Sequence, residues 1–140
     1  GRLDYDSEGL ILMTDDGELA QHTMHPRYEV EKTYIATLEG HIGGNVCRRL
    51  VRTGIQLDDG WIKLDHCSIV TQNRERSVVK AVIHSGKNRI VRRIFGAAGF
   101  PVTQLLRTQI GPIRLGDLKS GSYRVLSAAE VNALHKAVGL

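Results

Sequence analysis

The sequence predicts an α+β fold in which a mixed, largely antiparallel sheet is flanked by helices. Residues 30–38 alternate between two faces as a strand does, whereas apolar residues around 90–98 recur at the spacing of a helix. The expected strands and helices do not follow the strict strand–helix–strand rhythm of a parallel fold. The 140 residues, 41% of them hydrophobic, suffice for one core. Residues 1–140 are therefore expected to form one domain.

The first expected elements are a buried strand and a short helix. The apolar run 10–14 is bounded by a glycine and by the acidic turn that follows it, which indicates a strand. Asp15 and Glu18 form a candidate capping pair at the start of a helix that reaches about residue 25. The proline at position 26 cannot continue that helix and is expected to end it.

A strand and an amphipathic helix come next. In the strand over 30–38, Lys32 and Tyr34 project from the same face because side chains two residues apart share a face. The helix over 44–53 carries aliphatic residues on one side and three arginines on the other, and Gly54 is expected to end it.

The second half of the chain is expected to add most of the sheet. Strands over 62–71 and 77–84 flank a polar loop, so antiparallel pairing is the simplest connection. The helix around 89–98 packs one apolar stripe and leaves its arginines on the other face. The remaining expected elements are a strand over 105–115 bent at Gly111-Pro112, a strand over 122–126, and a helix over 128–138 that begins at the capping box of Ser127 and Glu130.

Charge is distributed unevenly along the chain, whose net charge is +4 and whose pI is about 9.3. Residues 1–31 hold eight acids and two arginines, whereas residues 85–124 hold eight bases and one aspartate. A basic segment of this kind suits a polyanion such as a nucleic acid, and the alternative is a solvated charged face. The sequence has no apolar run long enough for a membrane span and no signal-like start, so a cytoplasmic monomer is expected.

Several classes of site are not indicated. His22 and His25 lie one helical turn apart without a third ligand, so no metal site is expected. Cys47 and Cys67 are too few and too far apart for a disulfide framework and are expected to be free thiols. The chain also lacks a phosphate-binding GxxxxGK[ST] loop, a GxGxxG fingerprint and a GxSxG elbow, and no cofactor is expected.

Asp4 is the leading candidate for a catalytic group. A lone aspartate in a loop often only shapes an Asx turn. A carboxylate can also attack an anomeric carbon if a neighbouring cation keeps it ionised in an apolar cleft. Arg92, Arg93 and Arg2 are the candidate cations. On the strand face shared by Lys32 and Tyr34, the tyrosine could stack on a flat ring and the lysine could contact a phosphate, although an ordinary amphipathic strand has the same pattern.

Five short motifs in a fixed order resemble pseudouridine synthases, in the branch that acts on small-subunit and large-subunit ribosomal RNA. The resemblance runs over nearly the whole chain, and any single motif would be weak. The motifs are Gly1-Arg2-Leu3-Asp4, the segment 8–17, Lys32-Thr33-Tyr34, the segment 86–93, and Leu105-Leu106-Arg107 with Ile110-Gly111-Pro112.

The resemblance implies the catalytic fold of that family and a cofactor-free isomerisation of a uridine, most directly in 23S ribosomal RNA. Asp4 matches the catalytic aspartate, Tyr34 the tyrosine that lies against the uracil, and Arg92 the basic residue that pairs with the aspartate. Leu105 matches the aliphatic position that packs on the flipped base. The further residues expected to bind substrate or RNA are Arg2, Leu3, Lys32, Lys87, Asn88, Arg89, Arg93 and Arg107.

Two departures from the family pattern leave alternatives open. The family usually has glutamine where this chain has Ile90, which changes a polar contact near the arginine helix. Members also usually carry a small RNA-binding domain of the S4 type and a further strand before the first motif, so residues 1–140 are expected to lack the N-terminal part of the catalytic domain. The alternatives are a non-enzymatic RNA-binding or ribosome-binding module with the same fold, or a synthase for another RNA. A carboxylate glycosidase is disfavoured because no second acid is placed to pair with Asp4.

Overall fold

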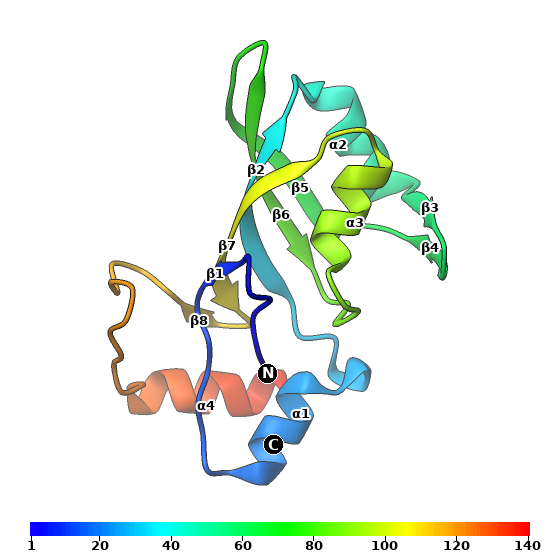
Figure 1. Cartoon of the computed structure of the whole chain (residues 1–140). Coiled ribbons are helices and arrows are strands. Elements are labelled where there is room, and N and C mark those ends of the chain that lie inside the picture. Colours follow the sequence, from blue (N-terminus) through cyan, green and yellow to red (C-terminus); the bar gives the residue numbers. More distant parts are fainter.

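A six-stranded sheet forms the centre of the molecule in the computed structural model, which describes all 140 residues (Figure 1). Its strand order is β1-β7-β2-β6-β5, and β8 pairs with β7. Apart from the parallel pair of β1 and β7, all its neighbours run antiparallel. This arrangement confirms the expected α+β class with a largely antiparallel sheet.

The strands and helices follow one another along the chain without a repeating unit. The strands are β1 (Glu8–Gly9), β2 (Lys32–Glu39), β3 (Ile55–Leu57), β4 (Gly60–Ile62), β5 (His66–Gln72), β6 (Arg76–Ile83), β7 (Val102–Ile110) and β8 (Ile113–Arg114). The helices are α1 (Gly17–Met24), α2 (Gly43–Arg52), α3 (Ile90–Ala97) and α4 (Ala128–Ala137), and a 3-10 turn covers Pro26–Tyr28.

The larger of two hydrophobic cores lies between the sheet and the helices α2 and α3, which stand on the same side of it in Figure 1. Phe95 of α3, Leu50 of α2 and Leu38 of β2 are fully buried there. The apolar stripe predicted for the arginine helix faces this core, since Ile90, Val91, Ile94 and Phe95 are all buried. Burial of such side chains contributes roughly 1.5–3 kcal/mol each.

The smaller core lies at the other end of the sheet, where α1 and α4 sit below it in Figure 1. It joins Leu134 of α4 and Val138, which caps that helix, to Leu19 of α1 and to Ile110 of β7 and Ile113 of β8. α4 begins at the predicted capping box, because Ser127 and Glu130 each accept a hydrogen bond from the other's backbone. This core anchors the segment that leads from β1 into α1.

Several expected elements differ from the structure. The run 10–14 is not a strand, because β1 stops at Gly9, although Leu10 is buried. The first helix is capped by Asp16 instead of Asp15, whose side chain does not reach a free N–H. The expected strand 62–71 is divided between β4 and β5, and Gly111 turns the chain back from β7 into β8. Residues 122–126 form no strand; the contact of Arg124 with the edge strand β8 is made by its side chain, which donates to the carbonyl of Arg114.

Candidate active site

The floor of the candidate site is formed by the neighbouring strands β2 and β7. Lys32 and Tyr34 share one face of β2, as predicted, and Leu105 and Arg107 share the same face of β7. The antiparallel register places Arg107 opposite Tyr34 and Leu105 opposite Ala36. The pairing shifts by one residue between Thr33 and Tyr34, and such a bulge next to a site re-aims the side chains beyond it.

The N-terminal segment is held against this floor by reciprocal contacts with Arg107. The Leu10 N–H donates to the carbonyl of Arg107 at 2.9 Å, and Nε of Arg107 donates to the carbonyl of Leu10 at 2.9 Å. Gly9 lies between them with φ of 115°, and a Cβ there would be 2.2 Å from the Arg107 carbonyl oxygen. Only glycine tolerates both that conformation and that approach. The path of residues 1–8 depends on this glycine.

A tight turn over residues 4–7 presents Asp4, and two arginines bind the turn. The Ser7 N–H donates to the carbonyl of Asp4 at 3.0 Å. Arg89 donates to both carboxylate oxygens of Asp6 at 2.9 Å, and Nη2 of Arg92 donates to the Asp6 carbonyl at 2.5 Å. The hydrogen bonds from Arg89, assisted by the charge of Arg92, lower the pKa of Asp6. This clamp fixes the turn to the start of α3.

The sequence predicted that Arg92 pairs with Asp4, but the guanidinium beside Asp4 belongs to Arg89. Nη1 of Arg89 lies 3.8 Å from Oδ2 of Asp4. Arg92 instead donates to the carbonyls of Asp6 and Val102, and its Nε lies 3.6 Å from Oδ1 of Asp6. The reason is local: the main chain of the turn and the start of β7 supply acceptors directly over Arg92. Arg92 therefore influences Asp4 only indirectly, because it helps to hold the turn that carries Asp4.

The left-handed conformation of Arg89 directs its side chain toward the turn. Arg89 is the N-cap of α3 and has φ of 51° and ψ of 32°, which is uncommon for a residue other than glycine. Such conformations cost of order 1–3 kcal/mol and concentrate at functional sites. The ion pair with Asp6 stabilises Arg89 in this position and raises its pKa.

A pocket of about 500 Å³ opens between the N-terminal turn, the strand floor and the loop before α3. Its volume is in the range of ligand sites. It is lined by all the residues expected from the sequence to bind or act on substrate except Arg92 and Arg93. Those that line it are Arg2, Leu3, Asp4, Lys32, Tyr34, Lys87, Asn88, Arg89, Leu105 and Arg107.

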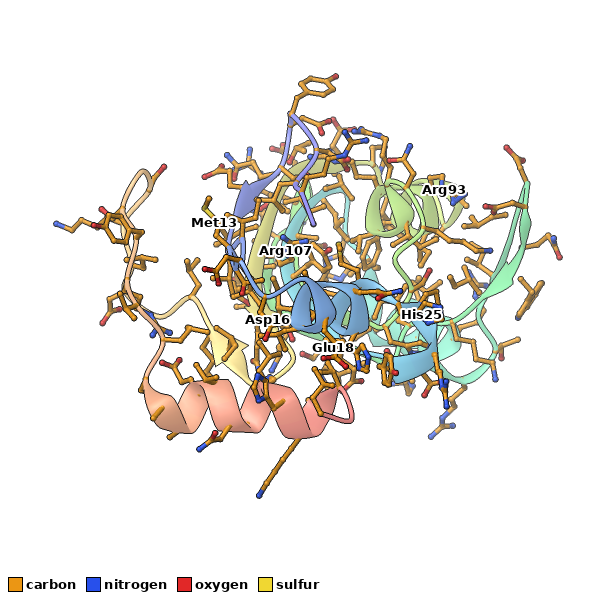
Figure 2. The ribbon with its side chains drawn as sticks, turned by 90° about the horizontal axis from the view of Figure 1, so that it is seen from below. Met13, Asp16, Glu18, His25, Arg93 and Arg107 are labelled. Atoms are coloured by element: carbon orange, nitrogen blue, oxygen red, sulfur yellow. The ribbon has the colours of Figure 1, made fainter.

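Arg93 lies outside the pocket and has a different set of partners. It donates to both carboxylate oxygens of Asp59, at 3.0 and 3.2 Å, and to the carbonyl of Asn88 at 3.1 Å. Lys87 approaches the same aspartate at 3.9 Å. Arg93 thereby ties the β3–β4 hairpin to the loop before α3. Figure 2 shows it on α3, well away from Arg107.

The sequence interpretation missed two features of the site. The role of Asp6 was not predicted, because its partners Arg89 and Arg92 lie more than 80 residues away in the sequence. Residues of α1, Thr23 and Met24, line the pocket as well. Their part in the pocket follows from the packing of α1 against the smaller core, which no local pattern reveals.

The histidines and cysteines singled out in the sequence lie elsewhere. His22 stacks on Tyr28 with ring centroids 4.4 Å apart, and its Nδ1 lies 2.8 Å from the carbonyl of Val138. No three histidine, cysteine or acidic side chains gather as a metal site would require. Cys47 and Cys67 are free, and their sulfur atoms are 3.0 Å apart. None of the helices has the length and apolar character needed to span a membrane.

Comparison with known proteins identifies the family of the chain. A family model described as RNA pseudouridylate synthase matches residues 1–97. An uncharacterized RNA pseudouridine synthase of Mycobacterium tuberculosis (strain ATCC 25618 / H37Rv) is 49% identical over 140 residues, which are 100% of this chain and 55% of that protein. Ribosomal large subunit pseudouridine synthase B of Bacillus subtilis (strain 168) is 40% identical over 136 residues, 96% of this chain and 55% of the relative.

The fold comparison gives the same result. A crystal structure described as a pseudouridylate synthase superimposes with a TM-score of 0.83 and 32% sequence identity, over 96% of this chain and 57% of that one. The chain thus spans about half the length of the curated relatives it matches. The predicted resemblance is confirmed by these matches. The chain belongs to the RNA pseudouridylate synthase family.

Proposed function

We propose that the protein isomerises uridine to pseudouridine in ribosomal RNA, with 23S RNA as the substrate, and that it works as a cytoplasmic monomer without a cofactor. The observation that carries this proposal is the position of Asp4. Asp4 lines a pocket of about 500 Å³, its carboxylate is 3.8 Å from Arg89, and Tyr34 and Leu105 line the same pocket. The choice of 23S RNA is supported by the name of the Bacillus relative, which acts on the large ribosomal subunit.

The proposed reaction begins with the carboxylate of Asp4. One of its oxygens bonds to C1′ of the ribose while the bond from C1′ to N1 breaks, and the electron pair stays on the uracil. The uracil turns in the pocket and its C5 bonds to C1′, which releases Asp4. Tyr34 takes the proton from C5 and N1 gains a proton, so that the product is an isomer of the substrate.

The pocket walls suit a nucleotide turned out of an RNA helix. Extrusion of a base costs roughly a few kcal/mol, and stacking with phosphate contacts must offset that cost. Tyr34 and Leu105 provide flat and aliphatic surfaces on the floor, and Arg2 and Lys87 provide positive charge among the lining residues. Arg89, Asp6 and Arg92 together hold the turn that carries Asp4.

The test is an isomerisation assay on unmodified 23S and 16S ribosomal RNA transcripts. Release of tritium from 5-tritiated uridine reports the reaction, and carbodiimide labelling with primer extension locates the product. We expect product in the 23S transcript and its loss in Asp4→Asn, with full activity in Asp58→Asn, which changes an exposed aspartate outside the pocket.

Each other outcome contradicts a particular part of the proposal. Product only in the 16S transcript would contradict the assignment to 23S RNA. Binding of both transcripts without product would instead favour the non-enzymatic RNA-binding alternative. Full activity in Asp4→Asn would contradict the role of Asp4.

A further inference from the structure

Two cationic side chains on the pocket floor have no anionic partner. Lys32 and Arg107 both line the pocket, and neither forms an ion pair with any carboxylate of the chain. Arg89, which lies 3.8 Å from Asp4, is already bound to Asp6. Asp4 is the only carboxylate that lines this pocket, so the floor carries an excess of positive charge.

The burial of Arg107 and the partial burial of Lys32 make these unpaired charges costly. Arg107 is 9% exposed, and only its Nε has a hydrogen-bond acceptor, the carbonyl of Leu10. Lys32 has no hydrogen-bond partner for its ammonium, and burial, followed by the charge of Arg107, lowers its pKa. Unpaired charges in such positions destabilise a fold unless a counter-charge arrives. Lys32 and Arg107 are therefore placed to bind a negatively charged group of the substrate.

The register identifies which part of the substrate lies nearest to these cations. Arg107 lies opposite Tyr34 across the two strands and two residues from Leu105, and Lys32 lies two residues from Tyr34. These are the side chains assigned to the base in the proposed function. Arg107 is labelled in the middle of the molecule in Figure 2 and is buried, whereas an RNA backbone passes over a surface. The base enters such a pocket more deeply than a phosphate does.

We propose that Lys32 and Arg107 stabilise the negative charge that develops on the uracil when the glycosidic bond breaks. This inference rests on the proposed function. When the bond from C1′ to N1 breaks, the uracil keeps the electron pair and its charge spreads over N1 and the carbonyl oxygens, while C1′ bonds to Asp4. Fixed cations act most strongly on charge that appears only in the transition state, in a site with little water. The negative charge passes back to the Asp4 carboxylate when C5 bonds to C1′, and the proton that C5 then loses is balanced by the proton that N1 gains.

The test compares two leaving groups in two lysine variants. A synthetic RNA hairpin carries either uridine or 5-fluorouridine at the position that the isomerisation assay identifies. Single-turnover loss of the nucleoside is measured by digestion and chromatography, and Kd is measured separately. The variants are Lys32→Met and Lys80→Met, since Lys80 is an exposed lysine on β6 outside the pocket. 5-Fluorouracil is more acidic than uracil, so its anion is more stable and its departure depends less on stabilisation by Lys32.

We expect Lys32→Met to slow uridine conversion by about 10²-fold, the usual loss for one group that stabilises developing charge. The loss should be at least three times smaller with 5-fluorouridine, Kd should change by less than twofold, and Lys32→Arg should recover part of the rate. Lys80→Met should match the wild type. Thermal unfolding should show that Lys32→Met is no less stable than the wild type, because it removes a partly buried charge without a partner.

The contrary outcomes are distinct. If Lys32→Met weakens binding equally for both RNAs, so that the change appears in Kd, Lys32 contacts a phosphate. If the rate is unchanged, Lys32 contacts neither the base nor a phosphate. Either result overturns the inference while the wild type remains active. An inactive wild type would refute the proposed function itself.

Discussion

Gly9→Ala should reduce the activity of the protein and leave most of its fold intact. Gly9 lies in β1 with φ of 115°, and an added Cβ would meet the carbonyl oxygen, nitrogen and carbonyl carbon of Arg107 at 2.2, 2.7 and 2.9 Å. All three atoms belong to the backbone of β7, so no side-chain rotation relieves the clash. The N-terminal segment must move away from β7 by roughly 1 Å or more to restore an ordinary contact distance.

The cost of that movement can be estimated from the contacts that it breaks. Alanine at this φ costs about 1–3 kcal/mol. Separation of the strands also weakens the two hydrogen bonds between Leu10 and Arg107, each worth about 0.5–1.5 kcal/mol. The sum of about 2–6 kcal/mol opposes docking of residues 1–10 but leaves the larger core intact. Because a misplacement of about 1 Å can reduce a rate by 10²-fold, we expect a loss of at least that size.

Gly17→Ala is the matched control. Gly17 is the first residue of α1, and a Cβ there meets nothing within 4 Å. That change should keep full activity and raise stability by about 0.4–1 kcal/mol. Isomerase activity and amide hydrogen exchange are measured on both variants, with fast exchange expected at Leu10 only in Gly9→Ala. Equal activity and equal exchange in the two variants would refute the argument that Gly9 positions Asp4.

Three further changes test other parts of the structure. Asp6→Asn weakens the clamp on Arg89 and should lower the single-turnover rate about tenfold or more with little change in thermal stability, whereas an unchanged rate would mean that the turn needs no clamp. Ser77→Ala removes the hydrogen-bond partner of the buried Ile42 N–H and of the Gly40 carbonyl. It should lower the free energy of unfolding in urea by about 2–4 kcal/mol, and a loss below 1 kcal/mol would contradict this prediction. Arg124 and the Ser127 backbone lower the pKa of Glu130 to about 2. The ionised Glu130 therefore contributes to the free energy of unfolding above pH 4.5, its pKa in the unfolded chain, and this contribution is lost as pH falls toward 2. Glu130→Gln should therefore make the free energy of unfolding depend less on pH in this range, and an unchanged pH dependence would contradict the prediction.

The sequence predicted correctly those elements that depend on residues close together in the chain. The alternation around Lys32 and Tyr34 identified β2 and the face that lines the pocket, and the capping box identified the start of α4. The failure at residues 10–14 has a tertiary cause. β2 occupies one edge of β7, and β8 pairs with Gln109 and Ile110 on the other, directly beyond the two residues that pair with β1. No edge of β7 remains for residues 10–14, so Leu10 and Leu12 pack on the smaller core without strand pairing, and Ile11 and Met13 are exposed.

The same distinction explains which part of the site could be predicted. Sequence motifs indicated the members of the pocket, but helical spacing could not determine which arginine faces Asp4. Arg92 is a regular helical residue, whereas Arg89 precedes the helix in a left-handed conformation that turns its guanidinium toward residues 4–6. That conformation is stabilised by Asp6, which lies 83 residues away in the sequence. The geometry around Asp4 is therefore set by a contact between two turns, and substitutions at Asp6 should disturb it as directly as substitutions at Arg89.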